Sequence, residues 1–126
     1  MLVKLGSYVY IFLTLALTVY GQLIFKWRMG MKGQMPPGVS SKFKYIFFAY
    51  LDPWIISGFA AAFLASVAWS IALTKFQLSY AYPFTSLSFV LVFIFSMIIF
   101  NEPFTWSRFF GIALICIGVI VIARGN

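Results

Sequence analysis

The sequence predicts an all-α integral membrane protein with four transmembrane helices in one domain, residues 1–126. Of its 126 residues, 63% are hydrophobic and only 9% are charged, and the mean hydropathy is +1.02. A soluble domain carries about 25% charged residues, so this chain has too few charges to cover a water-exposed surface. Charged residues also divide the chain into four apolar stretches, each near the roughly 20 residues that a membrane span requires.

The first predicted helix covers residues 5–25, between Lys4 and Lys26. This stretch is longer than the roughly 7–15-residue core of a signal peptide, and no small-residue cleavage site follows it. We therefore expect a transmembrane helix. Thr18, Gln22 and Lys26 are four residues apart, so they share one helix face.

Gln22 is costly in hydrocarbon unless it pairs or meets water. It therefore either makes a helix–helix hydrogen bond or recognises a polar headgroup. Lys26 reaches either a bulk lipid phosphate or the phosphate of a specific ligand, and Arg28 is a second candidate for that contact.

The connection between the first two helices, residues 26–52, is long and basic. It contains the lysines and arginines Lys26, Arg28, Lys32, Lys42 and Lys44. Its second half, residues 41–51, is basic and then aromatic, which is typical of a helix lying in the membrane interface. The alternative is an extension of the second transmembrane helix, bent at Pro53.

The second predicted helix covers residues 53–74 and carries a row of small residues on one face: Gly58, Ala61, Ala65, Ala68 and Ala72. Small residues allow helices to approach closely in lipid. We expect this row to pack within the chain; the alternative is one wall of a substrate chamber.

The third predicted helix covers residues 79–100 and lies in an uncharged run that is rich in hydroxyl groups. Pro83 removes a helical hydrogen bond and disfavours helical geometry at Tyr82. The carbonyls freed in this way must face a cavity or a neighbour. We predict substrate contacts from Tyr80, Tyr82, Ser86 and Ser88. The alternative is an interfacial tyrosine belt with a helix that begins at Pro83.

The fourth predicted helix covers residues 105–123. Gly111 and Gly118 share one face, which indicates either a dimer interface or packing within the chain. Glu102 lies just before this helix and near Arg108. We count Glu102 among the candidate substrate contacts; the alternative is an ion pair that closes the hairpin.

Several classes of function find no support. The chain has no His and one Cys, Cys116, so we expect no metal site and no disulfide. It has no acid pair and no glycine-rich phosphate loop, so we expect neither an enzyme nor a bound cofactor. The net charge of +7 favours contact with anionic membrane lipids. Nucleic-acid binding is not expected, because no long soluble basic segment exists.

The distribution of Lys and Arg predicts an orientation. The long connection and Arg108 together carry six of the nine basic residues, whereas the opposite side carries three. The positive-inside rule therefore places the long connection in the cytoplasm and both termini outside.

Short motifs along the chain resemble the small multidrug resistance family of the drug/metabolite transporter superfamily, and within it the subunits of the aminoarabinose-phosphoundecaprenol flippase (Arn type). The matching segments are Gly21-Gln22-Leu23 followed by Lys26, Ala81-Tyr82-Pro83, Ser86-Leu87-Ser88-Phe89, Glu102-Pro103, Gly111 and Gly118-Val119. The resemblance covers nearly the whole chain except residues 29–52. It implies a four-helix bundle of this family's type, working as a dimer.

Two departures change the implied function. Small multidrug exporters carry a membrane-embedded Glu where this chain has Thr18, and usually a Trp where it has Pro83. The missing Glu argues against proton-coupled export of cationic drugs. The resemblance therefore implies a flippase, or a flippase subunit, for an undecaprenyl-phosphate-linked sugar in the bacterial inner membrane. Its partner would be a second copy or a similar small subunit.

Two alternatives remain at this stage. One is a proton-coupled small multidrug or metabolite exporter. The other is an accessory membrane subunit that docks a glycosyltransferase through the long basic connection.

Overall fold

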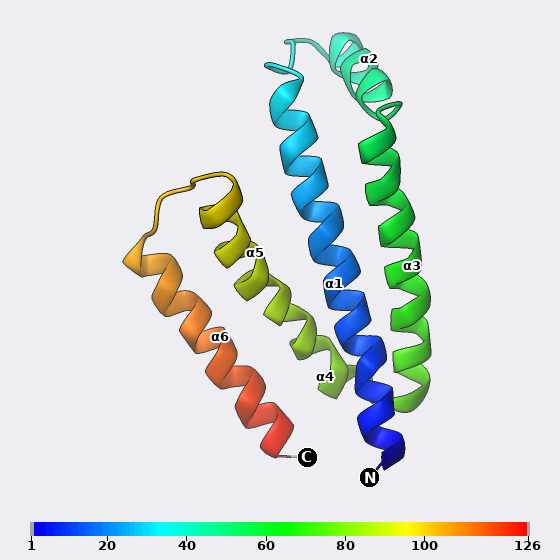
Figure 1. Cartoon of the computed structure of the whole chain (residues 1–126), viewed down its shortest axis with the longest axis vertical. Helices are drawn as coiled ribbons and strands as arrows, with labels where there is room; N and C mark the ends of the chain where they lie inside the picture. The colour runs from blue at the N-terminus through cyan, green and yellow to red at the C-terminus, as the bar shows by residue number, and fades with distance from the viewer. Residues whose placement is uncertain (1, 126) are drawn as a thin grey trace.

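The structure is a computed structural model that describes residues 2–125, with side chains from Gly6 onward, so the side chain of Lys4 lies outside the described part. The elements run in the order α1 (Leu2–Met31), α2 (Val39–Ala49), α3 (Pro53–Lys75), α4 (Leu78–Ala81), the 3-10 helix η1 (Tyr82–Ser86), α5 (Leu87–Ile99) and α6 (Trp106–Arg124). Figure 1 shows α1 beside α3, with the α5–α6 hairpin on the other side of α1.

Four helical segments in the described part are long and apolar enough to cross a membrane: Gly6–Met31, Pro53–Lys75, Leu78–Ile99 and Trp106–Arg124. The predicted fold class is therefore confirmed. Both termini lie at one end of the bundle, whereas α2 and the tip of the α5–α6 hairpin lie toward the other (Figure 1).

Helix α1 is longer than the sequence predicted. It continues past residue 25 to Met31, so Lys26 and Arg28 belong to its last turns and not to a loop. Basic side chains near a helix C-terminus interact favourably with the helix dipole, and the first break follows at Gly33, where φ is +82°. At about 1.5 Å per residue, a helix of 30 residues exceeds a hydrocarbon core of about 30 Å.

Helix α2 is a separate element and not an extension of α3. Asp52 is extended, with ψ 126°, and caps α3, and Pro53 occupies the first turn. The Tyr45 hydroxyl donates a hydrogen bond of 2.9 Å to the Gly33 carbonyl, which holds α2 against the loop that precedes it. The aromatic side chains of Phe43 and Phe47 are exposed. Their location in a membrane interface stays a prediction.

The small-residue row of α3 packs within the chain, as predicted. All five of its members, Gly58, Ala61, Ala65, Ala68 and Ala72, are buried, and α3 lies along α1 (Figure 1). A Cβ on Gly58 would lie 2.7 Å from a ring carbon of Phe25. A Cβ on Gly21 would lie 3.3 Å from the Gly58 carbonyl oxygen. This contact therefore depends on glycine from both helices.

The third span is interrupted where Pro83 predicts a disturbance. Instead of one helix over residues 79–100, a turn of α-helix, α4, passes into the 3-10 segment η1 before α5 begins. Two hydroxyls bond to carbonyls of this segment: Thr85 donates to the Tyr82 oxygen at 2.6 Å, and Ser86 to the Pro83 oxygen at 2.5 Å. The helical turn begins at Leu78, so the alternative of a helix starting at Pro83 does not hold.

Candidate substrate-binding site

The side of α1 that turns toward the third span lines two cavities. We call the first the charged cavity; it has a volume of about 260 Å³ and is lined by Gln22, Leu23, Lys26, Val92, Ser96, Phe100 and Glu102. Three of the predicted substrate contacts, Gln22, Lys26 and Glu102, are thus brought together from α1 and the α5–α6 loop. Lys26 is exposed and Glu102 is half-buried.

The second cavity on this face, the hydroxyl cavity, lies against the irregular segment of the third span. It has a volume of about 320 Å³ and is lined by Thr14, Leu15, Thr18, Tyr82, Pro83, Thr85, Ser86, Ser88 and Phe89. The predicted contacts Tyr82, Ser86 and Ser88 therefore share one cavity. The Thr14 hydroxyl donates to the Tyr10 carbonyl at 2.7 Å and lies 3.5 Å from the Ala65 carbonyl of α3, so Thr14 borders both the cavity and the α1–α3 contact.

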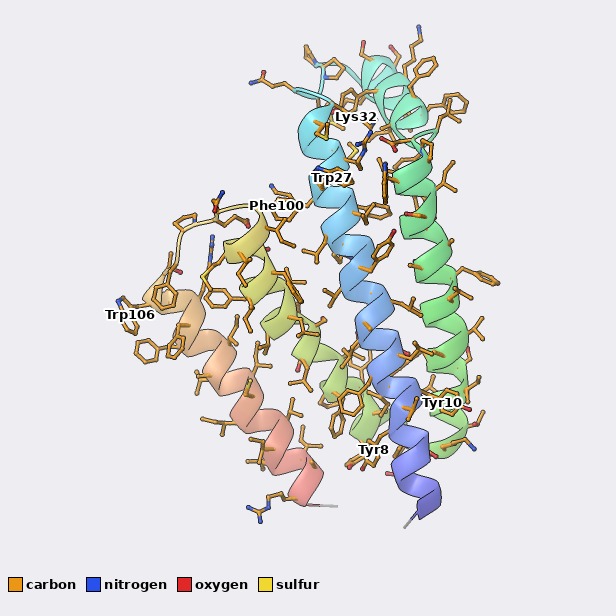
Figure 2. All side chains as sticks on the ribbon, in the orientation of Figure 1. Tyr8, Tyr10, Trp27, Lys32, Phe100 and Trp106 are labelled. Atoms are coloured by element: carbon orange, nitrogen blue, oxygen red, sulfur yellow. The ribbon has the colours of Figure 1, made fainter. Side chains whose placement is uncertain are left out.

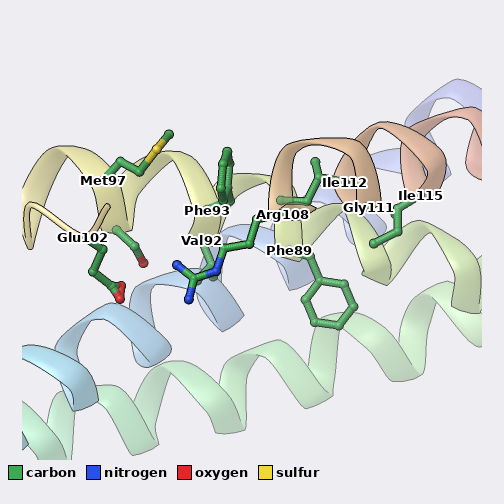
Figure 3. A pocket seen from close by; sticks show the side chains of 10 residues that line it. Phe89, Val92, Phe93, Met97, Glu102, Arg108, Gly111, Ile112 and Ile115 are labelled. Atoms are coloured by element: carbon green, nitrogen blue, oxygen red, sulfur yellow. The ribbon is translucent and has the colours of Figure 1, made fainter. Parts of the chain in front are cut away.

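A third cavity, the hairpin cavity, lies between α5 and α6 and has a volume of about 430 Å³. Its lining is Phe89, Val92, Phe93, Ser96, Met97, Glu102, Arg108, Gly111, Ile112 and Ile115. Figure 3 shows Glu102 and Arg108 at the same end of this cavity. The alternative of a hairpin-closing ion pair between them does not hold: among the described residues, both salt bridges end on Asp52.

The three cavities adjoin one another. Glu102, Ser96 and Val92 line both the charged and the hairpin cavity, and Phe89 lines both the hairpin and the hydroxyl cavity. Along α1, polar residues recur every four positions from Thr14 through Thr18 and Gln22 to Lys26. At about 1.5 Å per residue this row spans about 18 Å, more than half of a hydrocarbon core of about 30 Å.

Arg28 does not line these cavities, although the sequence suggests it as a phosphate contact. Its Nε atom lies 2.8 Å from Asp52 Oδ2, and Lys32 Nζ lies 3.0 Å from the same oxygen. Asp52 Oδ1 accepts from the Trp54 backbone N–H at 2.8 Å. This cluster fastens the end of α1 to the start of α3.

The Asp52 carboxylate is well shielded, with its side chain only 3% exposed. Burial alone raises the pKa of Asp52, but the hydrogen bonds from Lys32, Arg28 and Trp54 outweigh it and lower the pKa to about 2. Asp52 is therefore ionised at neutral pH. Its carboxylate pairs with the Arg28 guanidinium, so Arg28 is bound to the protein itself and not available to a ligand.

Tyr80 also lies apart from the cavities. Its hydroxyl lies 2.5 Å from the Tyr8 hydroxyl, and its ring packs on Phe76 and Phe84. Figure 2 places Tyr8 near the start of α1, far along the helix from Trp27. The structure thus gives Tyr80 an aromatic packing environment and brings it into none of the three cavities.

The two glycines of α6 differ in their surroundings. Gly111 lines the hairpin cavity, whereas Gly118 is exposed on a face with Leu114 and Val121. A Cβ on either glycine would meet nothing within 4 Å. Packing inside the chain therefore does not explain them, and the surface around Gly118 is free to meet lipid or another subunit.

Sequence reasoning missed three residues of the site: Thr14, Ser96 and Arg108. Thr14 extends the four-residue spacing of the α1 face by one step, so the pattern contained a signal for it. Ser96 is a hydroxyl among apolar residues of α5, and Arg108 was considered as an ion-pair partner of Glu102 but not as a substrate contact. Among the described residues, no group of three or more His, Cys, Asp or Glu side chains could hold a metal ion.

Known proteins are similar in sequence to this chain over most of its length. The chain is similar to the probable 4-amino-4-deoxy-L-arabinose-phosphoundecaprenol flippase subunit ArnF of Sodalis glossinidius, at 38% identity over 86% of this chain and 84% of that protein. It is also similar to the probable subunit ArnE of the same flippase from Serratia proteamaculans, at 31% identity over 93% of this chain and 95% of that protein. No solved structure matches the chain.

These similarities confirm the resemblance that the motifs indicate. With four helices able to span a bilayer, the chain is a multi-pass membrane protein. Residues 1–124 match one transporter family over almost the whole chain. The chain belongs to the EamA-like transporter family.

Proposed function

We propose that this chain is a flippase subunit that moves an undecaprenyl-phosphate-linked sugar across the bacterial inner membrane. The observation that carries the proposal is the row of adjoining cavities along α1, with a lysine at one end and hydroxyl groups at the other. Relatives named as subunits of an aminoarabinose-phosphoundecaprenol flippase support this substrate class.

The chemistry of the cavities suits a phosphate attached to a sugar. Lys26 is a flexible point charge that fits a phosphate, and Gln22 next to it offers both a donor and an acceptor. Tyr82, Ser86 and Ser88 present hydroxyls to sugar hydroxyls farther along the path. The polyprenyl chain would remain in the surrounding lipid, which dissolves it without any protein pocket.

A second subunit completes this proposal. The hairpin cavity lies on the α5–α6 side, and the Gly118 surface of α6 has no partner within the described chain. Relatives named ArnE and ArnF are separate subunits of one flippase. We therefore propose a dimer, either of two copies or with a similar small subunit, with α6 at the interface.

The test is flipping in liposomes reconstituted with this protein, alone and with a candidate partner subunit. The probe is undecaprenyl phosphate carrying 4-amino-4-deoxy-L-arabinose. We expect Lys26→Ala and Tyr82→Ala each to slow flipping about tenfold or more. Lys26 would lose a charge-assisted hydrogen bond, and Tyr82, which is exposed in the structure, would lose the aromatic contact that a bound headgroup covers; each loss corresponds to about 1.4 kcal/mol or more. Lys44→Ala, on the exposed surface of α2, is the matched control and should leave the rate unchanged.

Normal rates in both site variants would overturn the site assignment. Uptake of cationic drugs driven by a proton gradient, without lipid flipping, would instead support the exporter alternative. Mass spectrometry of lipids that co-purify with the protein gives an independent answer, since the proposal requires polyprenyl phosphates among them.

A further inference from the structure

A binding site for phosphate alone would not explain why Glu102 lines the cavities. The chain has two acidic residues, and Asp52 is fully engaged by Arg28, Lys32 and the Trp54 backbone. Glu102 is half-buried and lines both the charged and the hairpin cavity. A carboxylate in the wall of a phosphate site is unfavourable, because like charges repel across a medium of low dielectric constant.

Cations lie on both sides of Glu102 without pairing to it. Lys26 shares the charged cavity with it, and Arg108 shares the hairpin cavity. In the described part of the chain, neither cation comes within the 4 Å that defines a salt bridge to this carboxylate. Figure 3 shows Arg108 and Glu102 both reaching into the space between α5 and α6. Charges of both signs therefore line one continuous space that a ligand can enter.

This arrangement matches a headgroup that itself carries both charges. We propose that Glu102 accepts hydrogen bonds from a primary ammonium group on the sugar, while Lys26 and Arg108 hold the phosphate. Glu102 is then the specificity-determining residue that selects an amino sugar over a neutral sugar on the same lipid phosphate. The inference rests on the proposed flippase function and extends it by assigning the amine contact to one side chain.

The wild-type protein provides the first test. Flipping rates in liposomes are compared for the lipid with a free amine and for the same lipid N-acetylated, which removes the positive charge and keeps the sugar. We expect the free amine to be preferred about tenfold, as a charge-assisted hydrogen bond implies. Equal rates for the two lipids would overturn the inference without the need for any variant.

The Glu102→Gln variant provides the second test. It keeps the shape and the hydrogen-bonding oxygen but removes the charge, so the preference for the free amine should fall close to onefold. Flipping of the acetylated lipid should persist, which shows that the variant is folded. Arg108→Gln is the matched control: it should slow both lipids by the same factor and leave the preference intact.

The outcomes separate this inference from the proposed function. If the wild-type protein moves neither lipid, with or without a partner subunit, the flippase proposal fails. If it moves both, and Glu102→Gln keeps the full preference for the free amine, only the assignment of Glu102 fails.

Discussion

The two sides of α1 differ in packing and in polarity. On one face, glycine and alanine of α3 bring the two helices into direct contact, and every member of the small-residue row is buried. On the other face, threonine, glutamine and lysine line cavities of about 260 and 320 Å³. One helix therefore supplies both a tightly packed contact and the wall of a polar path.

The difference extends to the helices on each side. In the most apolar stretch of each helix, 33% of the α3 residues are buried, compared with 6% in the third span and 6% in α6. Helices in lipid associate through close packing and not through the hydrophobic effect. The α1–α3 pair is therefore the more tightly packed half of the chain, and the α5–α6 hairpin is the half that leaves more surface for lipid or a partner.

The largest expected effect comes from breaking the tight contact at Gly58. In Gly58→Leu, the new side chain would start 2.7 Å from a ring carbon of Phe25, so the Phe25 ring must shift and lose its packing against Phe59. We expect the free energy of unfolding to fall by about 1–3 kcal/mol, the usual cost of overpacking. Reversible unfolding in mixed detergent micelles measures this change.

The matched control for Gly58 is Gly30, a helical glycine of α1 whose added Cβ would meet nothing within 4 Å. Gly30→Leu should leave stability nearly unchanged. If Gly58→Leu unfolds with the wild-type free energy, the two helices are not packed as closely as the structure describes.

The spans and the packed face could be predicted from the sequence because their signals are local. Charges bound each apolar run, and the spacing of small residues on α3 fixes one face of one helix. The disturbance at Pro83 was predictable for the same reason, since proline acts on its own turn. Each of these inferences depends on a few neighbouring residues only.

The pairing of side chains across the bundle could not be predicted in this way. Arg28 meets Asp52, and Tyr80 meets Tyr8, across 24 and 72 positions of the chain. Composition shows that each group needs a partner but not which partner it finds. Gln22, Lys26 and Glu102 were each predicted separately as substrate contacts. Only the tertiary fold brings them into one cavity.

A smaller effect, on the association of two chains, should follow from a substitution at Gly118 on the exposed surface of α6. Because an added Cβ at Gly118 would meet nothing within 4 Å in the described part of the chain, Gly118→Leu should leave the free energy of unfolding unchanged. If α6 forms the dimer interface, the bulky side chain should weaken association about tenfold, which corresponds to about 1.4 kcal/mol. Förster transfer between labelled subunits in liposomes measures the association.

Ile120→Leu is the control on the same helix, because it keeps an exposed apolar side chain of equal size. It should dimerise as the wild-type protein does. Unchanged association in Gly118→Leu would move the interface to another face of the molecule, with the α5 side of the hairpin as the next surface to test.

The smallest expected effect concerns the Asp52 cluster, which joins the end of α1 to the start of α3. Asp52→Asn keeps a capping oxygen for α3 but removes the charge that Arg28 and Lys32 share. Since the pKa of Asp52 is lowered to about 2 in the folded protein, against about 3.9 in an unfolded chain, its ionised form favours folding. That contribution is fully present above about pH 4 and is lost as the pH falls through about 2.

Thermal unfolding of the wild-type protein and of Asp52→Asn, followed from pH 7 to pH 2, measures this contribution. We expect the wild-type protein to be the more stable at pH 7. The difference in stability should narrow between about pH 4 and pH 2, because protonation of Asp52 then removes from the wild-type protein the charge that the variant already lacks. Comparing the two proteins at each pH cancels the contributions of the ionisable groups that both contain. A difference in stability that stays constant down to pH 2 would mean that the Asp52 charge does not hold α1 to α3, and that small-residue packing alone joins these two helices.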